Sequence, residues 1–263
     1  MPLITLLRPL LGGVILLGAL LSPLRALEPL SPAQACLLRS YPDWIEKIEE
    51  NRVYFKEGSS MLWDDGETKS YEEAFLAADL EDQFAFPYPK GREFEVPRMG
   101  EDSSRLRSME FFKRIYGATP KEVKRSLRRV PWLPSLQKGV SVEVTTINGI
   151  DQRIERISRQ IEQLPESLRA IALHPSGGFY WRHIAGSSIL SMHSFGIALD
   201  LDPKASRYWL WDREKKGQVR YENTIPLEIV EIFEREGFIW GGKWGHYDTM
   251  HFEYRPEILC HSH

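Results

Sequence analysis

Two short stretches in the C-terminal part of the chain constrain its fold most, because they combine metal-ligand residues with the alternation of strands. Residues 191–200 contain His193 and Asp200, and residues 248–253 contain His251. Two imidazoles and one carboxylate, with a fourth position left open for water, form the ligand set of a catalytic zinc. All 7 histidines lie in the C-terminal part, so the first half of the chain offers no imidazole ligand.

The alternation of side chains predicts that both stretches contain strands. Residues 196–202 alternate aliphatic side chains with small and acidic ones, and residues 250–254 alternate apolar side chains with His251 and Glu253. Asp200 and His251 are then expected to face a common cleft, which His193 reaches from the preceding loop. A hydrogen-bonded core histidine and solvent-exposed strand-end carboxylates are the alternatives, and the spacing alone leaves them open.

The order of the predicted elements indicates an α+β fold with a small antiparallel sheet. Residues 27–163 are expected to form an N-terminal helical region packed on the catalytic part, with one helix over residues 40–50. The catalytic region is predicted to span residues 164–263, with strands over 170–173, 179–182 and the two ligand stretches. Helices first and mostly strands later favour this fold class.

The first 26 residues are predicted to be a signal peptide. Arg8 precedes an apolar run over residues 10–21, which is shorter than the roughly 20 residues of a membrane span. Cleavage is expected after Ala26 or after Ala35. The mature chain then has no stable membrane span and is expected in the periplasm or cell envelope. An uncleaved anchor and a lipoprotein attached through Cys36 are the alternatives.

The charge of the chain argues against a polyanionic partner. The formal charge is −3, and removal of a leader with two arginines and no acidic residue makes it −5 (−3 − 2). A hydrophobic content of 42% and a charged content of 27% are ordinary for a soluble globular protein. We therefore expect no nucleic acid partner.

The 2 cysteines, Cys36 and Cys260, lie near the two ends of the mature chain. In an exported protein an even pair is read as a disulfide. Such a bond would tie the N-terminal segment to the stretch that follows the His251 strand. A zinc-ligand role for Cys260 is less favoured, because the predicted site already has three ligands.

The ligand motif resembles that of the zinc D-alanyl-D-alanine carboxypeptidases of the VanY type. The matching pattern is Ser191-x-His193-x-x-Gly196-x-Ala198-x-Asp200, followed by Asp248-x-x-His251. The wider family includes D-Ala-D-Ala dipeptidases and phage L-alanyl-D-glutamate endolysins. The resemblance covers about residues 164–256 and implies a hedgehog/DD-peptidase-like fold, in which helices pack on a small antiparallel sheet. It also implies one zinc, held by His193, Asp200 and His251, and peptidoglycan stem peptides as substrate.

The resemblance also implies two catalytic residues. Asp248 is the predicted general base, because the family places an acidic residue three positions before the second histidine. Arg182 is the candidate for stabilising the oxyanion. It follows Ser176-Gly177 by more residues than in the family pattern, so a surface ion pair is the alternative for this arginine.

Other residues near the motif are candidates for substrate and ligand support. Ser191 and Ser194 are predicted to bind the substrate carboxylate, with support of His193 as the alternative. Trp244 is a candidate substrate platform or a core residue. Glu253 is predicted to orient the ring of His251, as outer carboxylates do at metal sites. His246 is the substitute ligand if His251 is not one.

The leading functional hypothesis is an exported zinc peptidase of peptidoglycan, a D-Ala-D-Ala carboxypeptidase in the first place. An endopeptidase for L-Ala-D-Glu or L,D-type bonds is the alternative within enzymes. A non-catalytic hedgehog-like zinc-binding module and a metal-free wall-binding protein are the other classes. Asp248 separates enzyme from module, because a module kept for binding has no use for a base.

Overall fold

A computed structural model describes residues 29–216 and 219–262 of the chain. The predicted signal peptide, residues 1–26, therefore lies outside the described residues. Of its two expected cleavage points, only Ala35 falls within them.

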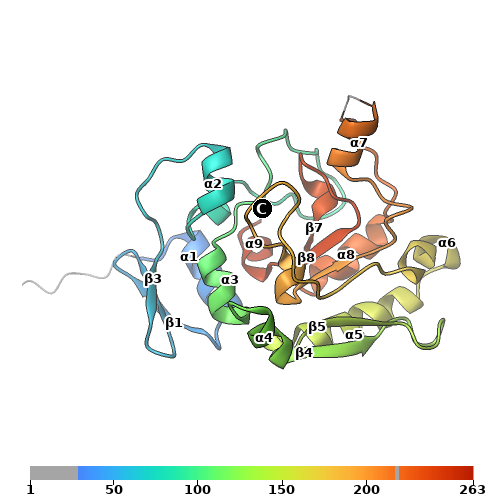
Figure 1. The fold of residues 1–263 in the computed structure, drawn as a ribbon, viewed down its shortest axis with the longest axis horizontal. Coiled ribbons are helices and arrows are strands. Elements are labelled where there is room, and N and C mark those ends of the chain that lie inside the picture. The colour runs from blue at the N-terminus through green and yellow to red at the C-terminus, as the bar shows by residue number, and fades with distance from the viewer. Residues whose placement is uncertain (1–28, 217–218, 263) are drawn as a thin grey trace, which may run out of the picture.

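The described chain contains three small antiparallel sheets with helices packed around them (Figure 1). The first sheet has the order β1-β2-β3, the second β4-β5 and the third β6-β8-β7. The strands are β1 (Ile45–Glu49), β2 (Arg52–Phe55), β3 (Ser60–Leu62), β4 (Leu127–Pro131), β5 (Ser141–Thr145), β6 (Ala198–Asp200), β7 (Phe238–Trp240) and β8 (His251–Tyr254). The fold is α+β with small antiparallel sheets, as the sequence predicted.

The helices are short, and those that begin at residues 32, 71 and 120 follow a Ser or Thr whose side chain caps the first turn. They are α1 (Pro32–Ser40), α2 (Tyr71–Ala77), α3 (Met109–Tyr116), α4 (Pro120–Val123), α5 (Ile150–Glu162), α6 (Glu166–Arg169), α7 (Trp209–Lys216), α8 (Leu227–Arg235) and α9 (Pro256–His261). In α2, Ser70 and Glu73 form a reciprocal capping box. In α5, Ile154, Ile157 and Ile161 are fully buried along one face. No helix among the described residues has both the length and the apolar composition needed to cross a membrane.

The region before residue 164 is not simply helical, which corrects the prediction. The expected helix over residues 40–50 is instead the end of α1 followed by β1, which turns into β2 at Glu50 and Asn51. Both turn residues have positive φ angles, 48° and 59°. A two-residue turn of this kind matches the twist of a hairpin, so turn chemistry decides against the helix.

Two predicted strands of the catalytic region are also absent. Residues 170–173 form the 3-10 helix η4 (Ala170–Leu173), and residues 179–182 belong to no strand. The second segment is still held in place by its backbone: Phe179 N donates to Glu143 O at 2.6 Å, and Tyr180 N donates to His193 O at 3.1 Å.

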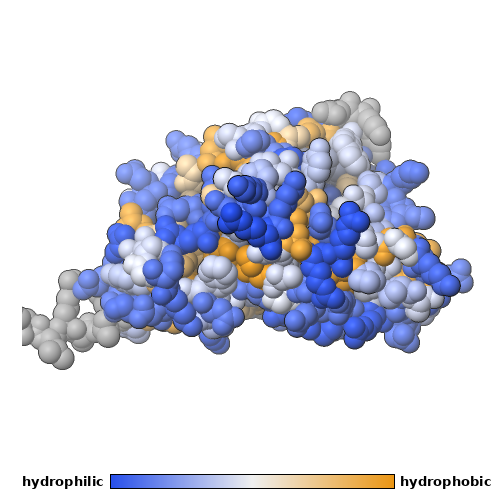
Figure 2. Space-filling view, turned by 60° about the horizontal axis from the view of Figure 1, so that its bottom comes forward, coloured by the Kyte–Doolittle hydropathy of each residue, from blue (hydrophilic) through white to orange (hydrophobic). Residues whose placement is uncertain are grey.

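One continuous hydrophobic cluster spans both predicted regions, from Leu37 in α1 to Leu259 in α9. Helices α1 and α9 pack against each other, although they lie at opposite ends of the described chain. Outside this core, hydrophilic residues dominate the face shown in Figure 2, with smaller hydrophobic areas between them. The N-terminal region and the ligand-bearing region therefore share one core.

The third sheet places the two ligand stretches side by side. In the antiparallel pairing of β6 with the central strand β8, Asp200 lies directly opposite His251. Directly opposed residues share a face of the sheet, so both side chains project to the same side. Gly196 precedes β6 with a φ of 69°, and a Cβ there would lie 3.0 Å from Thr145 N. Glycine thus permits the contact in which Thr145 N donates to Gly196 O at 3.0 Å.

The Cys36–Cys260 pair lies where α1 meets α9, with Cα atoms 5.5 Å apart and a sequence separation of 224 positions. The structure gives the pair the geometry of a disulfide, and the covalent bond itself stays a prediction.

We expect protein purified from the cell envelope to contain no free thiol. We expect the Cys36→Ser/Cys260→Ser variant to lose about 2–5 kcal/mol of unfolding free energy, because its unfolded chain is less restricted. Thiol titration in denaturant and urea unfolding measure both, and two free thiols in the wild type would contradict the bond.

Candidate metal centre

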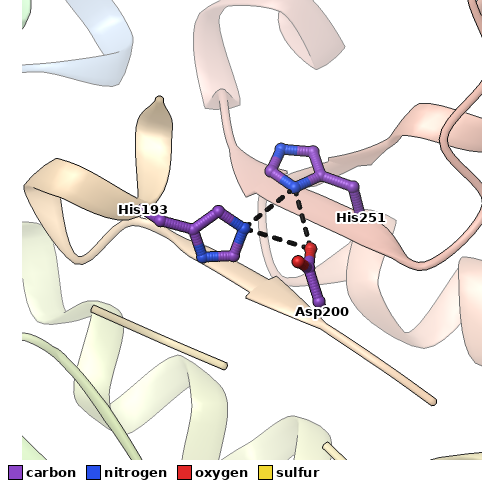
Figure 3. Close-up of side chains that lie close together, drawn as sticks. All are labelled: His193, Asp200 and His251. Atoms are coloured by element: carbon purple, nitrogen blue, oxygen red, sulfur yellow. Dashed lines mark hydrogen bonds and ion pairs between the residues drawn. The ribbon is translucent and has the colours of Figure 1, made fainter. Parts of the chain in front are cut away.

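Three side chains converge on one point beside the third sheet (Figure 3). His193 comes from the 3-10 helix η5 (Met192–Phe195), Asp200 from the end of β6 and His251 from the start of β8. His193 Nε2 lies 3.1 Å from Asp200 Oδ1 and 3.2 Å from His251 Nδ1, and the latter lies 2.9 Å from Asp200 Oδ1. The three atoms form a nearly equilateral triangle.

The outer partners of the two rings fix which nitrogen faces the triangle with a lone pair. His193 Nδ1 lies 2.7 Å from Gly178 O, a carbonyl that only accepts, so Nδ1–H donates there. His251 Nε2 lies 3.0 Å from Glu253 Oε2, so this nitrogen likewise carries the hydrogen. When both rings are neutral, two imidazole lone pairs and the Asp200 carboxylate face one another, so the set favours a positive charge, either a proton or a metal ion, at its centre.

The electrostatics and the dimensions of the triangle both fit a small divalent cation. Burial lowers the pKa of His251, but hydrogen bonds to Asp200 and Glu253 outweigh it and raise that pKa to about 9. Burial raises the pKa of Asp200, but His193 and His251 hold it well below its usual value. Ligand atoms about 2.0–2.1 Å from a tetrahedral zinc lie about 3.3 Å apart, close to the observed edges.

Glu253 forms the outer layer of the site. Its side chain is fully buried, and besides the His251 ring it accepts from Arg107 Nη2 at 2.7 Å and from Arg255 Nη1 at 3.2 Å. Burial raises the pKa of Glu253, but Arg107 and His251 outweigh it and hold that pKa well below its usual value. The Glu253 carboxylate therefore stays charged, and its hydrogen bond orients the His251 ring. This is the role expected of an outer carboxylate at a metal site.

A cavity of about 300 Å³ opens beside the triangle, and Asp200, His251 and Asp248 all line it. Asp248 Oδ1 is buried and has no hydrogen-bond partner among the described residues. Burial and the nearby charge of Asp200 raise the pKa of Asp248 to about 6. A buried polar atom without a partner is rare in folded proteins, so this oxygen is available to a ligand in the cavity.

The structure brings three of the other predicted site residues to the same cavity. Arg182, Ser191 and Trp244 all line it. The ring of Trp244 lies 5.7 Å from the ring of His251, measured between centroids. Arg182 is exposed at the rim, in the irregular segment that precedes η5.

Two predicted residues lie elsewhere. Ser194 is fully buried: its hydroxyl accepts from Arg182 N at 3.0 Å and donates to Arg182 O at 2.8 Å. Ser194 therefore fixes the backbone that carries Arg182 and does not reach a substrate, which corrects the predicted binding role. His246 pairs with Asp102 and is not part of the triangle, so its role as substitute ligand does not apply.

Sequence reasoning missed several residues that complete the cavity, among them Arg105, Arg107, Tyr208 and Trp211. Arg105 and Arg107 precede α3, far from the ligand motif in sequence. Their only sequence signal is that two arginines stand close together in a loop, which is equally typical of a solvated surface.

Two other groups of acidic side chains lie close together, formed by Asp64, Asp65, Asp79, Glu81 and Asp82. Their centre is already occupied by a cation of the chain. Lys69 Nζ lies 2.7 Å from Asp65, 3.3 Å from Asp79 and 2.8 Å from Asp82. The His193–Asp200–His251 triangle is thus the candidate metal centre within the described ranges.

Comparison with known proteins agrees with this site. Residues 185–254 match the family described as D-alanyl-D-alanine carboxypeptidase. Over 68 residues, the chain is 37% identical to the peptidoglycan L-alanyl-D-glutamate endopeptidase CwlK of Bacillus subtilis (strain 168). That alignment covers 25% of this chain and 40% of the relative, so the chain matches less than half of the relative's length. No solved structure gives a significant match. The family match contains the triangle and Asp248 but not Arg105, Arg107 or Arg182.

We expect His193→Ala and His251→Ala to lose most of the bound metal after dialysis against zinc and then against metal-free buffer. Each variant removes one of the three ligands. The loss of zinc affinity should therefore exceed the roughly 10–100-fold loss that follows removal of a residue that only supports a ligand. Elemental analysis measures the metal content. His174→Ala is the matched control, because His174 is exposed and outside the triangle. A wild-type chain that retains no metal would contradict the site.

We expect Glu253→Gln to weaken zinc binding by about 10–100-fold, since the amide no longer holds the His251 ring as a carboxylate does. The variant also leaves Arg107 and Arg255 without their shared anion, so its melting temperature should fall. Competition with a chelator gives the affinity, and thermal unfolding gives the stability. Zinc affinity equal to the wild type would show that Glu253 does not support the ligand.

Proposed function

Because the chain belongs to the D-alanyl-D-alanine carboxypeptidase family of peptidases, we propose that it is a zinc metallopeptidase that hydrolyses peptidoglycan stem peptides. One observation carries the proposal: the His193–Asp200–His251 triangle borders the cavity that Asp248 also lines, and Asp248 Oδ1 has no partner among the described residues. The cavity thus combines a candidate metal site with a candidate general base, the two groups that a hydrolytic metallopeptidase needs.

Zinc fits the donor set of His193, Asp200 and His251 better than a hard cation does. Two imidazole nitrogens and one carboxylate suit zinc, whereas magnesium and calcium prefer oxygen ligands throughout. When bound, zinc supplies Lewis-acid polarisation of a carbonyl oxygen and activation of water at neutral pH. The proposed fold is the hedgehog/DD-peptidase-like arrangement, supported by a three-stranded antiparallel sheet that carries two of the ligands.

Asp248 is the proposed general base and acid. Its free Oδ1 accepts a proton from the attacking water and returns it to the leaving amine, so no other group has to carry the proton. Arg182 at the rim of the cavity is the proposed donor to the developing oxyanion. Ser191 and Trp244 line the cavity between these groups, where they are proposed to hold the peptide.

The scissile bond is proposed to be D-Ala-D-Ala, which makes the protein a carboxypeptidase. The description of the matching family supports this choice. Cleavage of L-Ala-D-Glu is the second candidate, and the similarity to the Bacillus subtilis L-alanyl-D-glutamate endopeptidase supports it. Defined muropeptides distinguish the two: release of free D-alanine marks the first, and cleavage within the stem marks the second.

The proposed place of action is the periplasm or cell envelope, where peptidoglycan lies. The apolar run after Arg8 and the paired Cys36 and Cys260 support export. No nucleic acid partner is proposed for a chain with a formal charge of −3.

We expect zinc-loaded wild type to hydrolyse peptides ending in D-Ala-D-Ala or muropeptides, and Asp248→Asn to retain its zinc and fold while losing turnover by about 100-fold or more. The asparagine keeps the shape of the side chain but accepts no proton. Asp248→Glu should recover part of the rate. Mass spectrometry of the products and elemental analysis of each variant provide the measurements.

Asp202→Asn is the matched control for this prediction. Asp202 follows β6 closely, but its carboxylate accepts from Lys204 N at 2.9 Å and does not line the cavity. Full activity in Asp248→Asn would contradict the base. Wild type that holds zinc but cleaves no stem peptide would contradict the proposed function and favour a binding module.

A further inference from the structure

Arg105 is a buried cation in the wall of the cavity, and its guanidinium makes no ion pair with a described carboxylate. Its side chain is only 8% exposed, and it lines the cavity together with Asp248 and Trp244. Nη1 donates to His246 O at 3.0 Å, whereas Nε is buried without a hydrogen-bond partner. Within residues 29–216 and 219–262, no carboxylate lies within ion-pair distance of this guanidinium.

The other two arginines of the cavity differ from Arg105 in this respect. Arg107 is committed to Glu253, to which Nη2 and Nε donate at 2.7 and 3.3 Å. Arg182 is exposed at the rim, where water solvates its charge. Arg105 alone among the three is both buried and without an ion pair to a carboxylate of the described residues.

Buried charges in proteins are paired, because taking an ion out of water costs several kcal/mol that only an opposite charge and hydrogen bonds offset. Two carboxylates, Asp248 in the cavity and the buried Asp102, interact with Arg105 through space, but neither makes an ion pair with it. We propose that the missing partner is the substrate: Arg105 binds a carboxylate that lies beside the scissile bond and thereby selects acidic over amidated peptides.

The surroundings of Arg105 hold its guanidinium in one orientation. It lies against the Trp244 ring at 5.5 Å and the Phe75 ring at 5.6 Å. Its Nη1 bond goes to His246, whose own backbone N donates to the fully buried Asp102 at 2.6 Å. Because the planar guanidinium of Arg105 is already oriented, it loses little conformational freedom when it binds a carboxylate through two hydrogen bonds.

This inference rests on the proposed function and specifies its substrate class. A peptide ending in D-Ala-D-Ala carries its terminal carboxylate one residue after the cleaved bond, and an L-Ala-D-Glu bond has a carboxylate on the residue that follows it. One anion subsite beside the metal centre therefore serves either bond. A substrate in which that carboxylate is an amide lacks the counter-ion and is discriminated against.

The test compares matched acid and amide substrates. One pair is a stem peptide ending in D-Ala-D-Ala and its C-terminal amide, and the other contains L-Ala-D-Glu or its amidated form. We expect zinc-loaded wild type to favour the acid by about 10–100-fold in kcat/KM, the range of a charge-assisted interaction. Arg105→Gln should reduce this ratio to near one, and Arg105→Lys should give an intermediate ratio, because it keeps the charge without the fork.

A binding measurement separates this inference from the proposed function. In the zinc-loaded Asp248→Asn background, tryptophan fluorescence titration with the same peptides gives the acid-to-amide ratio of Kd with and without Arg105→Gln. Arg129→Gln is the control, because the side chain of Arg129 is 79% exposed and distant from the cavity lining. Metal content and melting temperature identify any variant that fails to fold.

The outcomes are distinguishable. A wild type that cleaves neither pair contradicts the proposed function, while the ratio of Kd values still decides the role of Arg105. An acid preference that disappears in Arg105→Gln and persists in Arg129→Gln supports the anion subsite. Equal treatment of acid and amide by the wild type, or an acid preference that survives in Arg105→Gln, overturns it.

Discussion

The buried carboxylate of Glu253 is the interaction on which the candidate metal centre depends. It holds the ring of His251 on one side and contacts Arg107 and Arg255 on the other, and all three ion-pair partners are buried with it. Such a group is tolerated in a protein interior only when its charge is balanced and its lone pairs are used. Arg107 comes from the loop before α3, so the N-terminal region completes the charge balance of a ligand that lies some 140 residues later in sequence.

The division of charge around the cavity follows from this arrangement. Glu253 forms ion pairs with two arginines, Arg107 and Arg255. The His193–Asp200–His251 triangle has no arginine partner among the described residues and can attract a cation. Asp248 lines the cavity but is not part of the triangle and forms no ion pair with an arginine of the described chain. Its Oδ1 therefore has no partner in the described structure. This condition suits the proposed role of Asp248 as general base, since its proton affinity is not already committed to a neighbour.

Much of the ligand geometry was predictable from the sequence because it is local. Alternation around Asp200 and His251 predicted two strands, and their pairing places the two residues opposite each other. The failures concern choices that depend on distant partners or on turns. Residues 45–49 have an apolar spacing that suits a helix as well as a strand, and the turn after them decides for the strand. Ser194 lies within the motif, yet its burial against the backbone of Arg182 is a tertiary contact that no spacing reveals.

The family match covers residues 185–254, whereas the candidate site extends beyond them. The matched segment contains the three candidate ligands and the proposed base, but not the arginines that balance the charge of Glu253. Arg107 provides the balancing charge, and the donation from Thr145 N to Gly196 O joins the motif to β5. The matched segment is therefore not a self-sufficient unit in this structure, because the preceding region delivers a cation to Glu253 and a backbone donor to Gly196.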